Sequence, residues 1–254
     1  MCGIAGYIGK KSIEPTVIRK TLELMENRGP DHQGYKHLNP NGVNIFLLHS
    51  RLSIIDCDVR ANQPFVLGGC SLVFNGEIYN YIELRGDLKK QGVECVTTSD
   101  TEVLLRYYLL YGEDCVKYFE GMWAFAIYDT QNNKLFLSRD RFAEKPLYYY
   151  QTNDGFYYGS EIKFIRSLSG QPFTINQRHL LRYLVQGYKS LYKTEETFFN
   201  EINEIDYATN LVINHDLKIR TYRYWVPQCR SNDKISISDA IDGARHYLLE
   251  SVRI

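Results

Sequence analysis

Short apolar stretches separated by turn residues recur along the chain, and they restrict the folds that it can adopt. Apolar residues that alternate with polar ones, or that run together briefly, are typical of β-strands. Asp129–Asn133 and the sequence TNDG favour tight turns, so each predicts a β-hairpin. The predicted strands are Gly3–Ile8, Ile45–Ile54, Ser71–Asn75, Gly121–Tyr128, Lys134–Ser138, Leu147–Gln151 and Phe156–Ser160.

Helix signals are fewer than strand signals and occur in blocks between the strands. Glu14–Asn27 carries Pro15 in its first turn, and Asn80–Gln91 begins with a capping pattern of Asn80 and Glu83. Because helices and strands do not alternate strictly, the sequence predicts an α+β fold with layered packing. The other predicted helices are Thr101–Tyr111, Ile162–Leu168, His179–Gln186 and Ser238–Ser251.

The stretch Pro227–Lys234 is polar and rich in turn residues, so we interpret it as a linker. It divides the chain into a domain at residues 1–226 and a segment at residues 227–254 that holds the last predicted helix.

Composition excludes several classes of function. Lys+Arg and Asp+Glu are 30 each, which leaves no excess charge for nucleic acid or an anionic membrane. No apolar run approaches the ~20 residues of a membrane span, and the N-terminus lacks a secretion signal. The six cysteines are scattered without a C-x-x-C pair, which favours a reducing cytoplasm over disulfides or zinc. The sequence has no nucleotide-binding or metal-binding motif, so we expect no cofactor and no metal.

A cysteine directly follows the initiator methionine, which gives it a chemical option that other cysteines lack. Residue 2 is small enough for Met1 to be removed, after which Cys2 carries a free α-amine. Such an amine has an ordinary pKa of about 7.7–8.0, beside a thiol of about 8.5. One residue then supplies both a nucleophile and its base. The alternative is an ordinary cysteine with a packing role.

Two charged residues stand where they could bind the two ends of an amino acid. Arg51 lies in an apolar run, and a guanidinium at a strand end can bind a carboxylate through two hydrogen bonds. Asp100 precedes a predicted helix and could bind an ammonium. The alternatives are a surface ion pair for Arg51 and a helix N-cap for Ser99 or Asp100.

The sequence FNGEIYN at Phe74–Asn80 also has two interpretations. Asn-Gly after an apolar run is a turn signal. Alternatively, the Asn75 side chain and the Gly76 N–H could stabilise an oxyanion, with Glu77 as a ligand contact. A loop at Arg28–Gly34 could fold over the ligand. These elements together would suit an amino acid with a side-chain amide, and glutamine fits, although spacing does not show that they meet.

The chain resembles the N-terminal glutaminase domain of glutamine-hydrolysing asparagine synthetases, which are class II amidotransferases. The resemblance implies a four-layer αββα N-terminal-nucleophile sandwich of two antiparallel sheets. The matching segments are MCGIAGYIG, NRGPDHQG, HSRLSIID, QPF, FNGEIYNYIELR, TSDTEVLL, FEGMWAFAIYD, LSRDRF, KPLYYY and GSEIKFI, in order over residues 1–168.

The resemblance also implies a role for each candidate residue. Cys2, freed of Met1, would attack the glutamine amide, with its α-amine as base and then acid. Asn75 and the Gly76 N–H would hold the oxyanion, Arg51 the α-carboxylate and Asp100 the α-ammonium. The other expected glutamine contacts are backbone groups of Leu52, Ser53, Ile54 and Ile55 and the side chain of Glu77.

In similar enzymes a second domain uses the released ammonia, and this determines the expected partners. That synthetase domain adenylates aspartate with ATP and Mg²⁺, and it begins with a helix like Ile237–Val252. We therefore expect a truncated synthetase whose glutaminase part needs no cofactor of its own, with ATP and Mg²⁺ belonging only to the missing domain. The expected partners are glutamine and that domain; a homodimer is an open alternative.

Two departures from the resemblance leave the amide acceptor open. Ala143 stands where similar proteins usually have Gly, and Tyr207-Ala208-Thr209 replaces a Pro-Gly turn. If the first turn needs a positive φ, Ala143 costs roughly 1 kcal/mol. The alternatives to aspartate amidation are amidation of a sugar acid or another carboxylate, and a non-catalytic scaffold.

Overall fold

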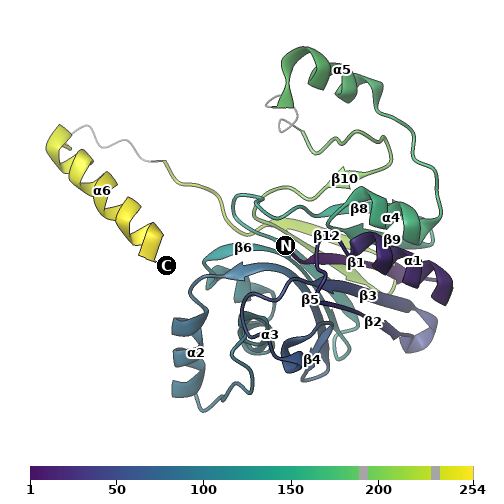
Figure 1. Ribbon diagram of the computed structural model, residues 1–254, viewed down its shortest axis with the longest axis horizontal. Coiled ribbons are helices and arrows are strands. Elements are labelled where there is room, and N and C mark those ends of the chain that lie inside the picture. Colours follow the sequence, from purple (N-terminus) through teal and green to yellow (C-terminus); the bar gives the residue numbers. More distant parts are fainter. Residues whose placement is uncertain (189–193, 230–234, 254) are drawn as a thin grey trace.

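The computed structural model describes residues 1–188, 194–229 and 235–253, and its strands form two six-stranded sheets in which neighbours run antiparallel (Figure 1). The first sheet has the order β10-β8-β9-β1-β3-β2 and the second β12-β11-β7-β6-β5-β4. The strands of the first sheet are β1 (Gly3–Gly9), β2 (His32–Leu38), β3 (Asn44–Arg51), β8 (Tyr148–Thr152), β9 (Gly155–Gly159) and β10 (Asn203–Glu204). Those of the second are β4 (Phe65–Leu67), β5 (Cys70–Ile78), β6 (Gly121–Asp129), β7 (Lys134–Arg139), β11 (Thr209–Asn214) and β12 (Ile219–Arg223).

Apolar side chains fill the space between the sheets and explain why the sheets stack face to face. β1 and β3 are buried along their whole length and contribute Ile4 and Leu47 to this inner core. β5 and β6 contribute Val73 and Ala126 from the opposite side. Alternate residues of a strand point to opposite faces, so the same strands also bury side chains toward the outer helices.

Helices cover the outer faces of both sheets, which completes four layers (Figure 1). α1 (Pro15–Met25) and α4 (Ile162–Ser169) pack on the first sheet through residues such as Ile18 and Phe164. α2 (Tyr81–Lys90) and α3 (Asp100–Tyr111) pack on the second through Leu84 and Leu104. The predicted α+β sandwich of two antiparallel sheets is therefore confirmed.

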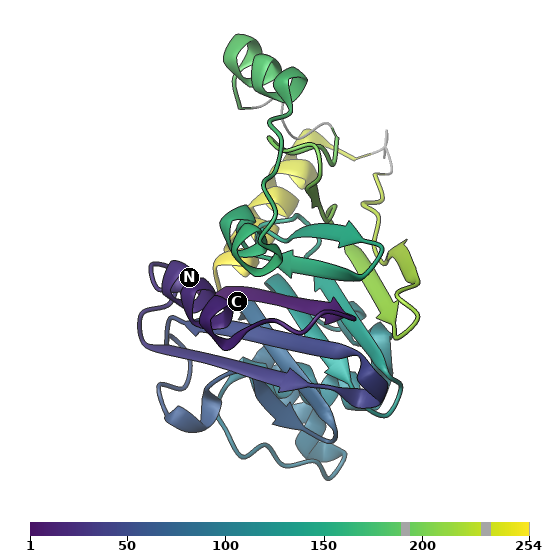
Figure 2. The ribbon, with the colours of Figure 1, turned by 90° about the vertical axis from the view of Figure 1, so that its right-hand side faces the viewer.

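Two further helices project from the sandwich (Figures 1 and 2). α5 (Gln177–Gln186) buries only His179, and α6 (Ile237–Arg253) buries none of its described residues. Within the described residues, short 3₁₀ turns lie at Pro40–Gly42, Val59–Ala61 and Gly112–Lys117. The proposed linker lies partly outside the described residues, since only residues 227–229 of it are described and they form no helix or strand. The division at residue 226 stays a prediction.

Several sequence-based boundaries were wrong for local reasons. β2, β4, β10, β11 and β12 were not predicted. β4 and β10 are short, β2 and β12 carry polar residues on both faces, and the apolar run of β11 is only three residues long. The predicted strand Ile45–Ile54 is too long, since β3 ends at Arg51. Asn80 does not cap α2 with its side chain, which instead donates to the Tyr118 carbonyl oxygen at 3.0 Å. Both predicted hairpins are present, as β6–β7 and β8–β9.

Candidate active site

Cys2 lies immediately before β1, where its thiol and its backbone are both held by neighbours. Its Sγ accepts a hydrogen bond from the Leu52 N–H at 3.3 Å, and its S–H faces the Leu52 carbonyl oxygen at 3.6 Å. Arg28 Nε donates to the Cys2 carbonyl oxygen at 2.9 Å, and Arg28 is paired with Glu161 at 3.1 Å. These contacts fix the sulfur in the wall of a cavity.

The cavity beside Cys2 gathers most of the predicted site residues from distant parts of the chain. Ser53 is the exception: it is not part of the wall, and its N–H donates to the Asp31 carboxylate at 2.7 Å. The wall consists of Met1, Cys2, Arg51, Leu52, Ile54, Ile55, Gln63, Phe74, Asn75, Gly76, Glu77, Ser99, Asp100, Thr101 and Lys145.

Arg51 ends β3, and the chain beyond it curls around the guanidinium. Nη1 donates to the Asp58 carbonyl oxygen at 3.0 Å and to Asn62 Oδ1 at 2.7 Å. Nη2 donates to the carbonyl oxygens of Ile55, at 3.4 Å, and Asp56. All four acceptors are neutral oxygens, so the buried guanidinium keeps its positive charge for a ligand carboxylate. The alternative considered for Arg51, a surface ion pair, is wrong because Arg51 is buried and its acceptors are neutral.

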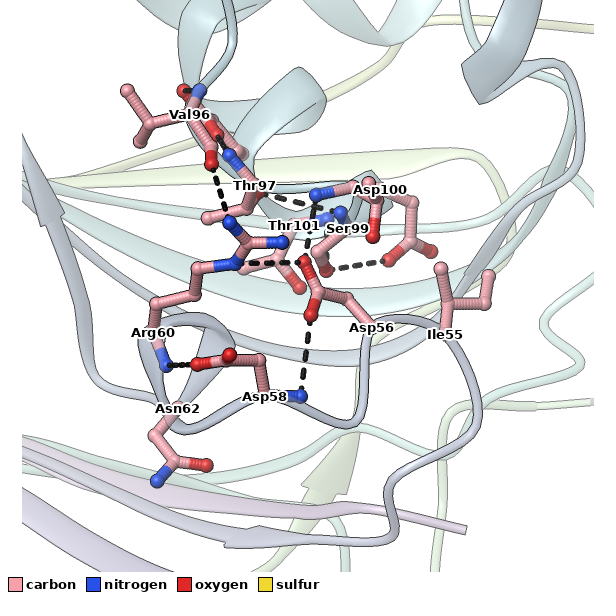
Figure 3. A network of polar contacts seen from close by, with 12 residues as sticks. Ile55, Asp56, Asp58, Arg60, Asn62, Val96, Thr97, Ser99, Asp100 and Thr101 are labelled. Atoms are coloured by element: carbon pink, nitrogen blue, oxygen red, sulfur yellow. Dashed lines mark hydrogen bonds and ion pairs between the residues drawn. The ribbon is translucent and has the colours of Figure 1, made fainter.

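The loop that surrounds this guanidinium is tied to the segment before α3 (Figure 3). The Asp56 carboxylate accepts hydrogen bonds from the Thr98 N–H at 2.6 Å and the Asp58 N–H at 3.2 Å. Arg60 pairs with Asp56 at 3.6 Å and donates to the Val96 carbonyl oxygen at 3.1 Å. Hydrogen bonds therefore connect the loop that surrounds Arg51 to the segment that leads to Asp100.

Asn75 and Gly76 lie inside β5 and not in a turn, so the turn interpretation of Asn-Gly was wrong. They pair with Ala124 and Trp123 of β6. A Cβ on Gly76 would collide with the Met122 carbonyl oxygen, so glycine is required here by close backbone approach. Asn75 is 1% exposed, and its Nδ2 has no hydrogen-bond partner among the described residues. That donor is available to a ligand oxygen.

Asp100 is the first residue of α3, and Ser99 is the N-cap. Ser99 Oγ accepts from the Thr101 N–H at 3.2 Å, so the capping role falls to Ser99 and leaves Asp100 for the cavity. The Asp100 carboxylate accepts from the Ile78 N–H at 3.1 Å. Burial raises the pKa of Asp100 to about 6, although these hydrogen bonds act in the opposite direction. A ligand ammonium would favour the ionised form of Asp100 and lower this pKa.

Two buried side chains that the sequence analysis did not single out brace the strand before Asn75. His49 on β3 bonds the Phe74 carbonyl oxygen through Nε2 at 3.0 Å, which links the two sheets. Gln63 accepts from the Phe74 N–H at 2.6 Å and donates to Thr101 Oγ1 at 3.3 Å. Gln63 belongs to the matching segment QPF, but a lone amide offers no recognisable chemistry in sequence.

Burial raises the pKa of the Cys2 thiol above its ordinary value, and Asp100 adds to the rise. The hydrogen bond from Leu52, the N-terminal amine and Arg51 act in the opposite direction. A thiol with a raised pKa is protonated at neutral pH, so it needs an adjacent base to become a nucleophile.

Lys145 and Arg28 are the charged neighbours of Cys2 to which the sequence analysis gave no role. Lys145 lines the cavity, and its Nζ donates to Met1 Sδ at 3.1 Å. Arg28 begins the predicted loop Arg28–Gly34, of which the last residues form the start of β2. Arg28 holds Cys2 rather than covering a ligand.

Comparisons with known proteins agree with this geometry. A family model described as "Glutamine amidotransferase domain" matches residues 1–225. The chain belongs to this glutamine amidotransferase family. It is 36% identical over 250 residues to the putative asparagine synthetase (glutamine-hydrolyzing) 2 of Methanocaldococcus jannaschii. That alignment covers 89% of this chain and 46% of the archaeal protein.

One further curated protein and one solved structure are also similar to this chain. Amidase chry2 of Gibberella zeae is 29% identical over 273 residues, covering 100% of this chain and 39% of that protein. The solved glutamine phosphoribosylpyrophosphate amidotransferase of B. subtilis has a TM-score of 0.66 and 18% identity, covering 91% of this chain and 50% of that one. This last likeness shows the fold alone. The chain spans less than half the length of the two curated relatives.

The domain is thus a class II glutamine amidotransferase of the asparagine synthetase family, and it is an enzyme domain. Within the part of the chain that the structure describes, no helix is long and apolar enough to cross a membrane. The same described residues contain no group of three or more His, Cys, Asp or Glu side chains that could hold a metal ion.

Proposed function

We propose that this domain hydrolyses glutamine to glutamate and ammonia, with Cys2 as the nucleophile. One observation carries the proposal: the Cys2 thiol shares a cavity with the buried, unpartnered Nδ2 of Asn75. Arg51 and Asp100 give the same cavity a positive and a negative side, as a free α-amino acid requires.

The chemistry begins once Met1 is removed and the α-amine belongs to Cys2. The amine accepts the thiol proton, and the sulfur attacks the side-chain amide carbon of glutamine. Asn75 Nδ2 and the Gly76 N–H donate to the oxyanion of the tetrahedral intermediate. The C–N bond breaks, and the amine returns the proton to the departing ammonia. Water then hydrolyses the thioester and releases glutamate.

Substrate recognition follows from the two charged sides of the cavity. Arg51 binds the α-carboxylate and Asp100 the α-ammonium, while Leu52, Ile54, Ile55 and Glu77 contact the remaining ligand surface. Ser53 is not part of the cavity wall, so it would contribute only by holding its chain neighbours Leu52 and Ile54 in place.

The fate of the ammonia is a second part of the proposal. The archaeal relative is named a glutamine-hydrolyzing asparagine synthetase, which supports asparagine synthesis as the use of the ammonia. We propose that a synthetase domain amidates aspartate in that step with ATP and Mg²⁺. The fungal relative, named an amidase, favours a different acceptor as the alternative. Amidation of a sugar acid remains a further alternative, and a homodimer and a cytoplasmic location stay predictions.

A set of three variants tests the hydrolysis. The N-terminus is read by mass spectrometry, and ammonia release from glutamine is measured for the parent protein and for Cys2→Ala, Arg51→Ala and Asn75→Ala. Cys2→Ala should abolish release, Arg51→Ala should raise KM strongly, and Asn75→Ala should lower kcat by ~10²–10³. A correctly processed parent without activity, or an active Cys2→Ala variant, contradicts the proposal.

A further inference from the structure

Lys145 is the charged cavity residue that the proposed mechanism leaves without a role. Its side chain lines the cavity, and the residue is 4% exposed. Its ammonium donates to Met1 Sδ at 3.1 Å, and the proposed mechanism removes that residue. A buried cation would then remain in the cavity that Cys2 lines.

The backbone of Lys145 is held in place independently of Met1. The Asp140 carboxylate accepts hydrogen bonds from the N–H groups of Phe142, Glu144 and Lys145, each at 3.0 Å. Arg139 Nε donates to the Lys145 carbonyl oxygen at 2.7 Å. Loss of Met1 therefore does not release the segment that aims Lys145 at the cavity.

We propose that Lys145 is a positioning residue that acts through the α-amine of Cys2. Its buried ammonium disfavours a second positive charge in the same cavity, so the amine stays unprotonated and can accept the thiol proton. Like charges in close proximity disfavour each other's charged forms, and burial strengthens the effect because little water screens it. This inference rests on the proposed function.

Other charged groups surround the N-terminus, and they divide by sign. Arg28 and Arg51 act in the same direction as Lys145, but Arg28 is paired with Glu161. In the proposed mechanism Arg51 binds the ligand carboxylate. Burial lowers the pKa of Lys145, and the negative charge of Glu77 opposes this effect. The carboxylates that favour a protonated amine are Glu77 on β5, Asp100 on α3, Asp140 and Glu144 in the loop of Lys145, and Glu161 before α4.

The first test follows kcat against pH at saturating glutamine, where bound ligand pairs with Asp100 and removes its titration from the profile. The protein is prepared with Cys2 as its first residue by cleavage of a removable N-terminal fusion. Lys145→Met should move the acidic limb of the profile upward by about one pH unit. Lys145→Arg should restore the parent profile, and Lys90→Met on the exposed face of α2 should not change it.

A second readout does not need activity. In the Cys2→Ala background, the α-amine of residue 2 is acetylated with acetic anhydride across a pH series, and the N-terminal peptide is quantified by mass spectrometry. The midpoint should rise by about one unit when Lys145→Met is added. Equal midpoints, or an equal rise with Lys90→Met, overturn the inference. A shifted midpoint, combined with a processed parent protein that keeps Cys2 and still releases no ammonia from glutamine, would instead reject the proposed function and leave the effect of Lys145 standing.

Discussion

At the scale of single residues, the site depends on polar groups that the fold buries with few protein partners. Asn75 Nδ2 has none among the described residues. Asp100 is 5% exposed, and its carboxylate accepts hydrogen bonds from the Ile78 N–H and Ser99 Oγ. A buried polar group that lacks a partner costs roughly 1–3 kcal/mol of stability. Such groups in one cavity therefore point to a ligand that completes their hydrogen bonds.

The first residue-scale prediction concerns the pH dependence of glutamine binding. Burial raises the pKa of Asp100 to about 6, so protonation below that pH removes the partner of the ligand ammonium. The KM for glutamine should rise as the pH falls below about 6. Asp100→Asn should raise KM at every pH and abolish this dependence. Steady-state kinetics between pH 5 and 8 measure both, and a parent KM that stays flat across pH 6 would contradict the assignment.

The same residue couples function to stability. A carboxyl group whose pKa is higher in the folded than in the unfolded state destabilises the fold once the pH exceeds the unfolded value. Asp100→Asn should therefore increase the free energy of unfolding at neutral pH, by about 1–2 kcal/mol, while it weakens glutamine binding. Urea titration of the ligand-free proteins provides the control for the kinetic experiment.

At the scale of elements, the two departures from the family resemblance meet at one turn. Ala143 and Ala208 both adopt left-handed backbone conformations, with φ of 56° and 49°. Both N–H groups donate to the Asp140 carbonyl oxygen, at 3.3 and 2.8 Å. The turn at Ala143 has the positive φ that glycine adopts without strain. The cost of roughly 1 kcal/mol expected for alanine at such a position therefore applies.

We predict that replacement by glycine affects stability differently at these two alanines. Ala143→Gly should stabilise the protein by about 0.5–1 kcal/mol through relief of backbone strain. Ala208→Gly should change stability little, because Ala208 is fully buried and loss of its methyl group offsets the gain. Thermal unfolding measures both. Ala61→Gly is the control, since Ala61 is buried at ordinary φ and should only lose stability; an equal loss in Ala143→Gly would contradict the prediction.

At the scale of the whole molecule, His49 joins the two sheets next to the proposed oxyanion site. It is fully buried, and burial lowers its pKa to about 3, with a smaller opposing effect of the bond to Phe74. The neutral ring therefore donates from Nε2 to the carbonyl that precedes Asn75. This bond connects the sheet that begins just after Cys2 to the sheet that contains Asn75.

His49 should make stability depend on pH. The unfolded chain binds a proton at this position below pH 6.5 while the folded chain does not, so stability is lost as the pH falls from about 6.5 toward 3. His49→Gln keeps a donor but cannot titrate. Between pH 7 and pH 5 the parent should lose about 2 kcal/mol more unfolding free energy than His49→Gln, as measured by urea titration. Parallel losses in the two proteins would exclude this role.

The local chemistry of the chain was predictable because it depends on neighbouring residues. Turn residues predicted both hairpins, Pro15 predicted the start of α1, and the Ser99 segment predicted a helix cap. Asn-Gly at Asn75 misled for the same reason: the dipeptide favours a turn locally, but pairing with β6 across nine residue pairs outweighs that preference.

The sequence by itself determined the reactive parts of this protein: a thiol behind the initiator methionine, a guanidinium at a strand end and a carboxylate at a helix start. Covalent order and local backbone preference settle those features. Only the tertiary structure decided that they share one cavity, that Ser53 is outside it, and that Lys145, Gln63 and His49 belong around it. The stacking of the two sheets brings those neighbours together. Burial between the sheets then sets their charges and hydrogen bonds, and no local sequence pattern encodes that burial.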